Sequence, residues 1–193
     1  MIAGLLLAAG YGRRFGGNKL CAKLDGKAIV RSSASVLLPT DALYVVVPPA
    51  ADQLTHALAR LDATFVVNLA RNEGMASSIR AGIAALAEDV EAVVIALGDQ
   101  PRADAAVTRA LCERWRAGEC DAVAPLYLEG QGTPVLFGRT CFSALSALRG
   151  DVGARSVLES GQFRVGHVHT GQHMPVDVDT VETLDALREH THD

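Results

Sequence analysis

Aromatic residues, basic residues and long apolar runs are all scarce in this sequence, and the last two scarcities each exclude a class of protein. Aromatic side chains make up 5% of the 193 residues, and 18 Lys and Arg residues are outnumbered by 22 Asp and Glu residues, for a net charge of −4. No generally basic surface for nucleic acid is expected, so any anion site must be local. Because no run of 18 apolar residues occurs, no membrane span is expected either.

The cysteines show neither a metal-binding nor a disulfide pattern. They stand at positions 21, 112, 120 and 141 without a CxxC pair, so we expect reduced thiols in a cytoplasmic protein. The N-terminal MIAGLLLAAG lacks the preceding positive charge of a secretory signal, and we interpret it as a first strand. The length predicts one domain, residues 1–193.

Short apolar runs alternate with segments of helical period, which predicts an α/β fold: a mostly parallel sheet with helices on both faces, in three layers. Strands are predicted at Ile2–Ala8, Ala42–Val47, Thr64–Asn68, Ala92–Leu97 and Ala122–Leu126, with Thr133–Phe137 and Arg164–His169 added at an edge. Helices are predicted at Ala28–Leu38, Ala51–Leu61, Met75–Ala87, Ala103–Ala117, Arg155–Glu159 and Val181–His190. In the third helix, one stripe is expected to be buried: Met75, Ile79, Gly82, Ile83 and Leu86.

The first strand runs into a glycine-rich, cationic loop, LLLAAGYGRRFGGNKL, at residues 5–20. Ligands of open α/β sheets bind outside the carboxyl ends of the strands, and backbone N–H groups with Arg and Lys side chains suit phosphate there. A Walker loop is excluded because Asn18 separates Gly17 from Lys19. A dinucleotide fingerprint fits poorly because the loop has GxGxxxG spacing.

The loop resembles the LAAGxSxRMGxxK signature of the MobA-like nucleotidyltransferases. The matching positions are Leu7, Ala8, Ala9, Gly10, Arg14, Gly16 and Lys19, whereas Gly12 replaces Ser and Phe15 replaces Met. Four further segments resemble family motifs in the same order: NEGMASSIRAG (72–82), LGDQP (97–101), GDVGAR (150–155) and VDVDTVETL (176–184). Together they span nearly the whole chain.

The resemblance implies a Rossmann-like nucleotidyltransferase fold and a specific reaction. Among family members, the sequence is most similar to the molybdenum cofactor cytidylyltransferases (MocA type). These imply transfer of CMP from CTP to the phosphate of molybdopterin, release of pyrophosphate, a need for Mg²⁺ and transient contact with a molybdenum hydroxylase. The alternatives are a guanylyltransferase that uses GTP and a noncatalytic carrier of the cofactor.

Arg14 and Lys19 are the predicted catalytic cations. Nucleotidyl transfer needs positive charge on the triphosphate, and the family's matching lysine helps to stabilise the transition state. We expect a backbone N–H at Gly12 to replace the phosphate contact of the hydroxyl that the family's Ser would supply. Arg13 has no family counterpart, and we expect it on the surface.

Carboxylates that follow strand ends are the predicted Mg²⁺ ligands. Asp99 follows the apolar run AVVIAL and a glycine, and a hard carboxylate there can bind Mg²⁺; the alternative is a cap for a helix beginning at Pro101. The resemblance implies a second ligand, Asp177 as first choice and Asp179 as second. The alternative role of Asp179 is to cap a helix opening at Thr180.

The predicted nucleoside contacts come from LAAG and from the start of the third helix. They are Leu7, Ala8, Ala9 and Gly10, with Gly74, Ser77 and Ser78, although the two serines have helix capping as an alternative role. Family members that use GTP have LAGG. A methyl group at Ala9 therefore favours the smaller pyrimidine, and hence CTP.

The acceptor-binding candidates are Thr133, Asp151 and Arg155. Thr133 stands where related cytidylyltransferases have the His of GHPVLF. We expect Asp151 and Arg155 to face the pterin or its phosphate or, alternatively, to pair with each other in a tight turn. Solvent-facing positions are expected for His167, His169 and His173, and a frayed tail for EHTHD at the end of the chain.

Overall fold

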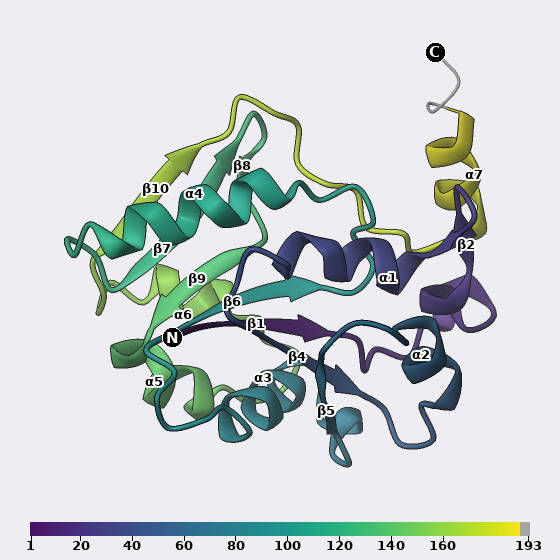
Figure 1. The fold of residues 1–193 in the computed structure, drawn as a ribbon, viewed down its shortest axis with the longest axis horizontal. Helices are drawn as coiled ribbons and strands as arrows, with labels where there is room; N and C mark the ends of the chain where they lie inside the picture. The colour runs from purple at the N-terminus through teal and green to yellow at the C-terminus, as the bar shows by residue number, and fades with distance from the viewer. Residues whose placement is uncertain (190–193) are drawn as a thin grey trace.

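The computed structural model describes residues 1–189, and its centre is a mixed sheet of eight strands (Figure 1). Seven follow the spatial order β10-β7-β9-β6-β1-β4-β5, and β8 pairs with β7. The strands are β1 (Ile2–Leu7), β4 (Ala42–Val47), β5 (Thr64–Val67), β6 (Ala92–Leu97), β7 (Ala122–Tyr127), β8 (Gly130–Gln131), β9 (Val135–Gly138) and β10 (Val165–His169). A separate antiparallel hairpin joins β2 (Lys23–Leu24) to β3 (Lys27–Ala28).

Parallel pairing brings the ends of the central strands to one edge of the sheet. β1 pairs in parallel with both β4 and β6, with Leu5 opposite Tyr44 and Ile95. These strands are buried on both faces, which explains their continuous apolar sequences. The loops that follow β1 and β6 therefore start side by side.

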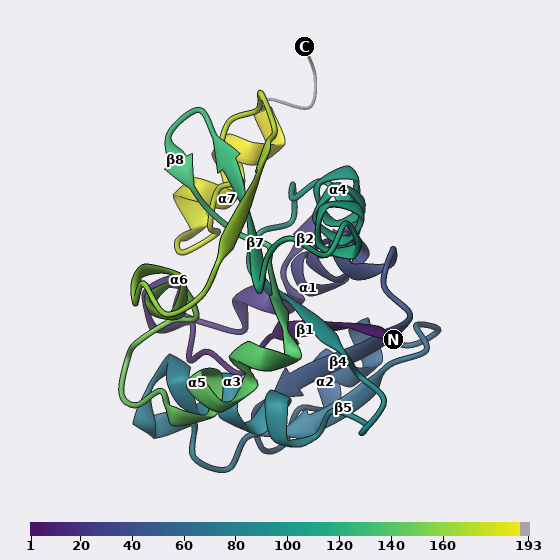
Figure 2. The same cartoon turned by 90° about the vertical axis from the view of Figure 1, so that its left-hand side faces the viewer.

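Helices cover both faces of the sheet. They are α1 (Ile29–Ala34), α2 (Asp52–Ala57), α3 (Met75–Ala84), α4 (Ala105–Arg116), α5 (Phe142–Ala147), α6 (Arg155–Glu159) and α7 (Val181–Glu189). One core cluster joins the sheet to α1, α2, α4 and α7, and the other joins it to α3, α5 and α6. Figure 2 shows the β10–β7 side of the sheet between α6 and α4. The expected α/β architecture, with helices on both faces of a mostly parallel sheet, is confirmed.

One strand lies in an unexpected place. β10 is at an edge as predicted, but β9 lies between β6 and β7 and runs antiparallel to both. The edge position predicted for Thr133–Phe137 is therefore wrong. Its Val135, Leu136 and Phe137 are buried because they alternate between the two core clusters on opposite faces of the sheet.

Several helix boundaries also differ from those predicted. The first three helices are shorter, and the segment after α1 continues as a 3₁₀ turn, Ser35–Leu37. Neither α5 nor the β2–β3 hairpin was expected. The last helix ends at Glu189; His190 and most of the predicted tail lie outside the described residues. No helix in residues 1–189 is both long and apolar enough to cross a membrane.

Smaller predictions have mixed outcomes. The predicted stripe on α3 holds for Ile79, Gly82 and Ile83, but Met75 is 41% exposed because it faces a cavity. The four cysteines are free thiols, without disulfides. His167, His169 and His173 are exposed as predicted.

Candidate active site

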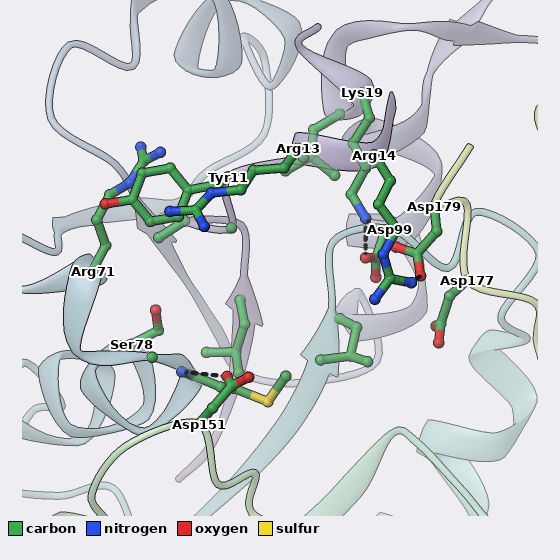
Figure 3. Close-up of a pocket in the computed structure, with 18 of the residues that line it drawn as sticks. Tyr11, Arg13, Arg14, Lys19, Arg71, Ser78, Asp99, Asp151, Asp177 and Asp179 are labelled. Atoms are coloured by element: carbon green, nitrogen blue, oxygen red, sulfur yellow. Dashed lines mark hydrogen bonds and ion pairs between the residues drawn. The ribbon is translucent and has the colours of Figure 1, made fainter. Parts of the chain in front are cut away.

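A cavity of about 800 Å³ opens at the carboxyl ends of β1 and β6 (Figure 3). Its walls come from the loop after β1, the 71–78 turn, the ends of β1 and β6, and isolated residues of the C-terminal third. The lining includes Leu7, Ala9, Gly10, Gly12, Arg14, Lys19, Gly74, Ser78, Asp99, Asp151, Asp177 and Asp179. Most of the predicted site residues thus share one cavity.

The loop turns sharply because two glycines adopt a left-handed conformation. Gly12 has φ +60° and Gly16 has φ +72°, and they bracket a 3₁₀ turn, Arg13–Phe15. This conformation favours glycine over residues with a side chain. Gly12, where the sequence departs from the family signature, is therefore a position at which the backbone favours glycine.

Lys19 connects the loop to two carboxylates. Its Nζ donates to Asp99 at 2.6 Å and to Asp179 at 3.0 Å, and its side chain is 11% exposed. Burial disfavours the charged ammonium, but the hydrogen bonds and charges of Asp99 and Asp179 outweigh it and raise the pKa of Lys19. Arg14 lies 3.4 Å from Asp179 and is otherwise largely exposed.

Asp177 lies beside Asp99 but has a different environment. It accepts a 2.8 Å hydrogen bond from Gln100. Desolvation by the surrounding residues and the charge of Asp99 raise the pKa of Asp177, and the bond from Gln100 opposes that rise. Figure 3 shows Asp99, Asp177 and Asp179 together opposite the loop; we call these three residues the carboxylate cluster.

The capping roles considered for two of these aspartates are wrong. α4 begins at Ala105, and its cap is Asp104, which accepts from the N–H of Ala106. The hydroxyl of Thr180, rather than the carboxylate of Asp179, accepts from a backbone N–H in the first turn of α7. Neither Asp99 nor Asp179 therefore caps a helix, and both contact Lys19.

The donor chemistry of the carboxylate cluster suits a hard divalent cation. Among residues 1–189, no three Asp, Glu, His or Cys side chains are arranged to hold a metal by themselves. Mg²⁺ is commonly bound by one or two carboxylates and completed by water and substrate phosphates. Asp99 and Asp177 fit that pattern, because the open cavity leaves room for the remaining ligands.

The two serines predicted to contact the nucleoside differ in their positions. Ser78 lines the cavity, but Ser77 does not. Both hydroxyls accept from the buried amide of Asn68, at 2.8 and 3.0 Å, and Ser77 also donates to the Gly74 carbonyl. Ser77 therefore supports the turn from behind, while Ser78 faces the ligand space.

Gly74 and the turn at residues 150–151 are in close contact. Gly74 has φ +91°, and a Cβ there would lie 2.5 Å from the carbonyl oxygen of Gly150. Asp151 lines the cavity and accepts from the first N–H of α3, at Met75. The GDVGAR segment thus closes one wall of the cavity.

The other acceptor candidates lie apart from the cavity lining. Arg155 pairs with Glu159 on its own helix, so the considered Asp151–Arg155 pair is not formed. The Thr133 hydroxyl donates to Gln100 at 2.6 Å. Neither residue is among those that line the cavity.

Tyr11 and Arg71 line the cavity although the sequence analysis did not name them, and Arg13 lines it although we expected it only on the surface. The guanidinium groups of Arg13 and Arg71 lie 4.8 and 3.7 Å from the centre of the Tyr11 ring (Figure 3), a favourable cation–π geometry. Arg13 is exposed as expected but also lines the cavity. The signal for Arg71 was its position in the loop after β5, at the same edge of the sheet.

Comparisons with known proteins agree with this architecture. Residues 4–168 match the MobA-like NTP transferase domain. The purine catabolism protein PucB of Bacillus subtilis is 31% identical, covering 97% of this chain and 96% of its own. Nicotine blue oxidoreductase of Paenarthrobacter nicotinovorans is 32% identical, covering 95% and 94%. Neither is named as a molybdenum cofactor cytidylyltransferase.

A solved structure is similar over nearly its full length. Rv0371c of Mycobacterium tuberculosis superposes with a TM-score of 0.87 at 28% identity, covering 97% of each chain. Another crystal structure of Rv0371c is a complex with manganese, with a TM-score of 0.83 at 27% identity and coverage of 97% and 98%. Fold and cavity together define an α/β nucleotidyltransferase. The chain belongs to the MobA-like NTP transferase family.

Proposed function

We propose that this chain, as a single domain of residues 1–193, transfers CMP from CTP to the phosphate of molybdopterin cofactor and releases pyrophosphate. The observation that carries the proposal is that Arg14 and Lys19 form ion pairs with members of the carboxylate cluster within one cavity. In-line transfer brings two anionic reactants together, so it needs fixed positive charge beside the phosphates. A noncatalytic carrier would not need this arrangement.

Lys19 and Arg14 are the catalytic cations of the proposal. The acceptor phosphate oxygen forms a bond to the α-phosphorus of CTP as the bond to the β-phosphate oxygen breaks, and pyrophosphate takes the electron pair. Lys19 exchanges its present bonds to Asp99 and Asp179 for the phosphate oxygens and stabilises the developing negative charge. Backbone N–H groups of Gly10 and Gly12 hold the triphosphate.

Asp99 and Asp177 are the proposed Mg²⁺ ligands, with Asp179 as the alternative second ligand. Mg²⁺, when bound, neutralises triphosphate charge at this end of the cavity. Before the nucleotide binds, Asp179 orients Lys19 and Arg14, because it contacts both. The manganese complex of Rv0371c supports a divalent cation in a related protein.

The base is proposed to bind between the LAAG strand end and the start of α3. Ala9 lines the cavity and is 3% exposed, so its methyl group takes space that a glycine would leave for a purine. The remaining nucleoside contacts are proposed from Leu7, Ala8, Gly74 and Ser78, with Ser77 supporting them. CTP is therefore favoured over GTP.

The acceptor side depends most on Asp151. It lies in the cavity wall beside α3, where it can meet a pterin amide or amine. Arg155 and Thr133, the other two acceptor candidates, lie outside the cavity lining and are bonded to Glu159 and Gln100 instead. The product is proposed to pass to a molybdenum hydroxylase in the cytoplasm.

A panel of nucleotides tests the proposal. Purified protein is incubated with Mg²⁺, molybdopterin cofactor and each of CTP, GTP, ATP and UTP, and pyrophosphate release is followed. We expect CTP to be preferred, and Ala9→Gly to shift the preference toward GTP. A wild-type preference for GTP would overturn the choice of base. Cofactor binding without pyrophosphate release from any nucleotide would overturn transfer and favour the carrier.

A further inference from the structure

Gln100 is a buried amide beneath the carboxylate cluster. Gln100 directly follows Asp99 in the sequence, and only 4% of the residue is exposed. Its Nε2 donates to Oδ1 of Asp177 at 2.8 Å and to the carbonyl of Pro175 at 3.5 Å. Its Oε1 accepts from Oγ1 of Thr133 at 2.6 Å. Both ends of the amide therefore have partners, as a buried polar group requires.

These partners specify one orientation of the amide. The reversed orientation would turn Oε1 toward the carbonyl of Pro175, which can only accept a hydrogen bond, and toward the carboxylate oxygen Oδ1 of Asp177. Leaving buried acceptors opposed in this way costs more than a typical hydrogen bond contributes. With the hydroxyl of Thr133 donating from the other side, the N–H₂ group faces Asp177.

Thr133 is itself held by the interior of the fold. Its carbonyl accepts a 2.8 Å bond from the hydroxyl of Tyr127, at the end of β7. A phenol is protonated at neutral pH and can donate this bond, and burial raises the pKa of Tyr127 further, to about 12. The buried strand β9 begins at Val135, two residues after Thr133.

Asp177, by contrast, lies on a segment without regular structure. Residues 171–179 form neither helix nor strand. The segment is attached to the β6 turn by the N–H of Val178, which donates to the Asp99 carbonyl at 2.9 Å, and by the bonds from Gln100. The direction of the Asp177 carboxylate therefore depends on side-chain contacts rather than on a helix or strand.

We infer that Gln100 and Thr133 are positioning residues, which hold the carboxylate of Asp177 beside Asp99 in the orientation that a divalent cation needs. Thr133 thus acts on the carboxylate cluster through Gln100, rather than as a contact to the acceptor. The inference rests on the metal site of the proposed function. Groups that orient metal ligands typically change metal affinity by about 10–100-fold when removed.

Direct Mn²⁺ binding, without nucleotide, tests the inference apart from activity. Free Mn²⁺ is measured by electron paramagnetic resonance for the wild type and for Thr133→Val, Thr133→Ser and Gln100→Ala. We expect Thr133→Val and Gln100→Ala to weaken Mn²⁺ binding about 10-fold, whereas Thr133→Ser, which keeps the hydroxyl, binds like the wild type. Thr140→Val removes an exposed hydroxyl outside the cavity and is the matched control.

Several results would overturn the inference. Wild-type Mn²⁺ affinity in folded Thr133→Val would do so, and so would equal losses in Thr133→Ser and Thr133→Val, which would indicate packing. An increase in the acceptor KM of Thr133→Val with unchanged Mn²⁺ affinity would restore Thr133 as an acceptor contact. If the wild type releases no pyrophosphate but the Mn²⁺ pattern holds, the proposed function fails and the positioning role stands.

Discussion

Replacing Lys19 with methionine tests whether one ammonium group carries the proposed chemistry. Lys19 donates to Asp99 at 2.6 Å and to Asp179 at 3.0 Å. Methionine keeps an unbranched apolar stem of similar length and removes the charge. We expect a large loss of turnover, because the ammonium stabilises the transition state. We also expect a moderate loss of stability, because the ammonium forms ion pairs with Asp99 and Asp179 in the folded protein.

The two effects differ in size. Loss of one preorganised donor to a developing negative charge typically lowers turnover by about 10²–10³-fold, or about 2.7–4 kcal/mol. A hydrogen bond to a charged group contributes about 1.5–3 kcal/mol to stability. The bond to Asp179 contributes less, because that side chain is 48% exposed and screened by solvent. The sum predicts a destabilisation of about 2 kcal/mol, or a Tm lower by about 4–8 °C.

The assay is pyrophosphate release from CTP with Mg²⁺ and acceptor, together with thermal unfolding of the nucleotide-free protein. Lys27→Met is the matched control, since Lys27 is an exposed lysine on β3 outside the cavity. Turnover of Lys19→Met equal to that of Lys27→Met would refute a catalytic role for the ammonium. Equal melting temperatures would refute the stabilising role of its ion pairs.

Three further predictions concern the cavity walls and a helix end. Gly74→Ala should lower the free energy of unfolding by more than about 1 kcal/mol and raise the KM for CTP, because its Cβ would meet the Gly150 carbonyl at 2.5 Å. Gly161→Ala is the control, since Gly161 has φ +70° but open space around it, and an equal fall in Tm for both variants would contradict the prediction. Asp104→Ala should cost about 1 kcal/mol at pH 7. The N–H of Ala106 is the main cause of the lowered pKa of Asp104. The stability that the cap contributes is therefore fully present above the ordinary pKa of 3.8 and is lost as the pH falls through the lower pKa of the folded state. Urea unfolding at neutral and acidic pH measures it, and a difference that persists undiminished in strong acid would argue against the cap. Tyr11→Leu should raise the KM for CTP because it removes the ring face beneath the guanidinium groups; Tyr11→Phe keeps that face, so an equal rise in both variants would exclude the stack.

The strands were largely predictable because a parallel sheet buried on both faces leaves continuous apolar runs in the sequence. Ala42–Val47 and Ala92–Leu97 were predicted with the bounds that the structure has. The place of β9 was not predictable, since an apolar run such as Val135–Gly138 looks the same at an edge and between two strands. The order of strands depends on pairing between distant segments, which periodicity does not encode.

For the candidate site, position after a strand was the informative signal. This signal predicted that Lys19 and Asp99 share one site, although they are 80 positions apart in the sequence. It did not reveal the partners of Thr133, because the direction of one hydroxyl depends on the packing of two other segments. The same limit applies to Arg71, whose contact with Tyr11 joins two loops that no spacing rule connects.

The path of the C-terminal segment has a consequence for synthesis of the protein. All strands of the main sheet are complete at His169, yet Asp177 and Asp179 follow later and return to the end of β6. A chain that has been synthesised only as far as His169 holds every strand described for the main sheet but lacks two members of the carboxylate cluster. A premature stop codon between residues 170 and 176 would therefore leave the sheet and the glycine-rich loop intact in sequence, and remove the chemistry proposed for them.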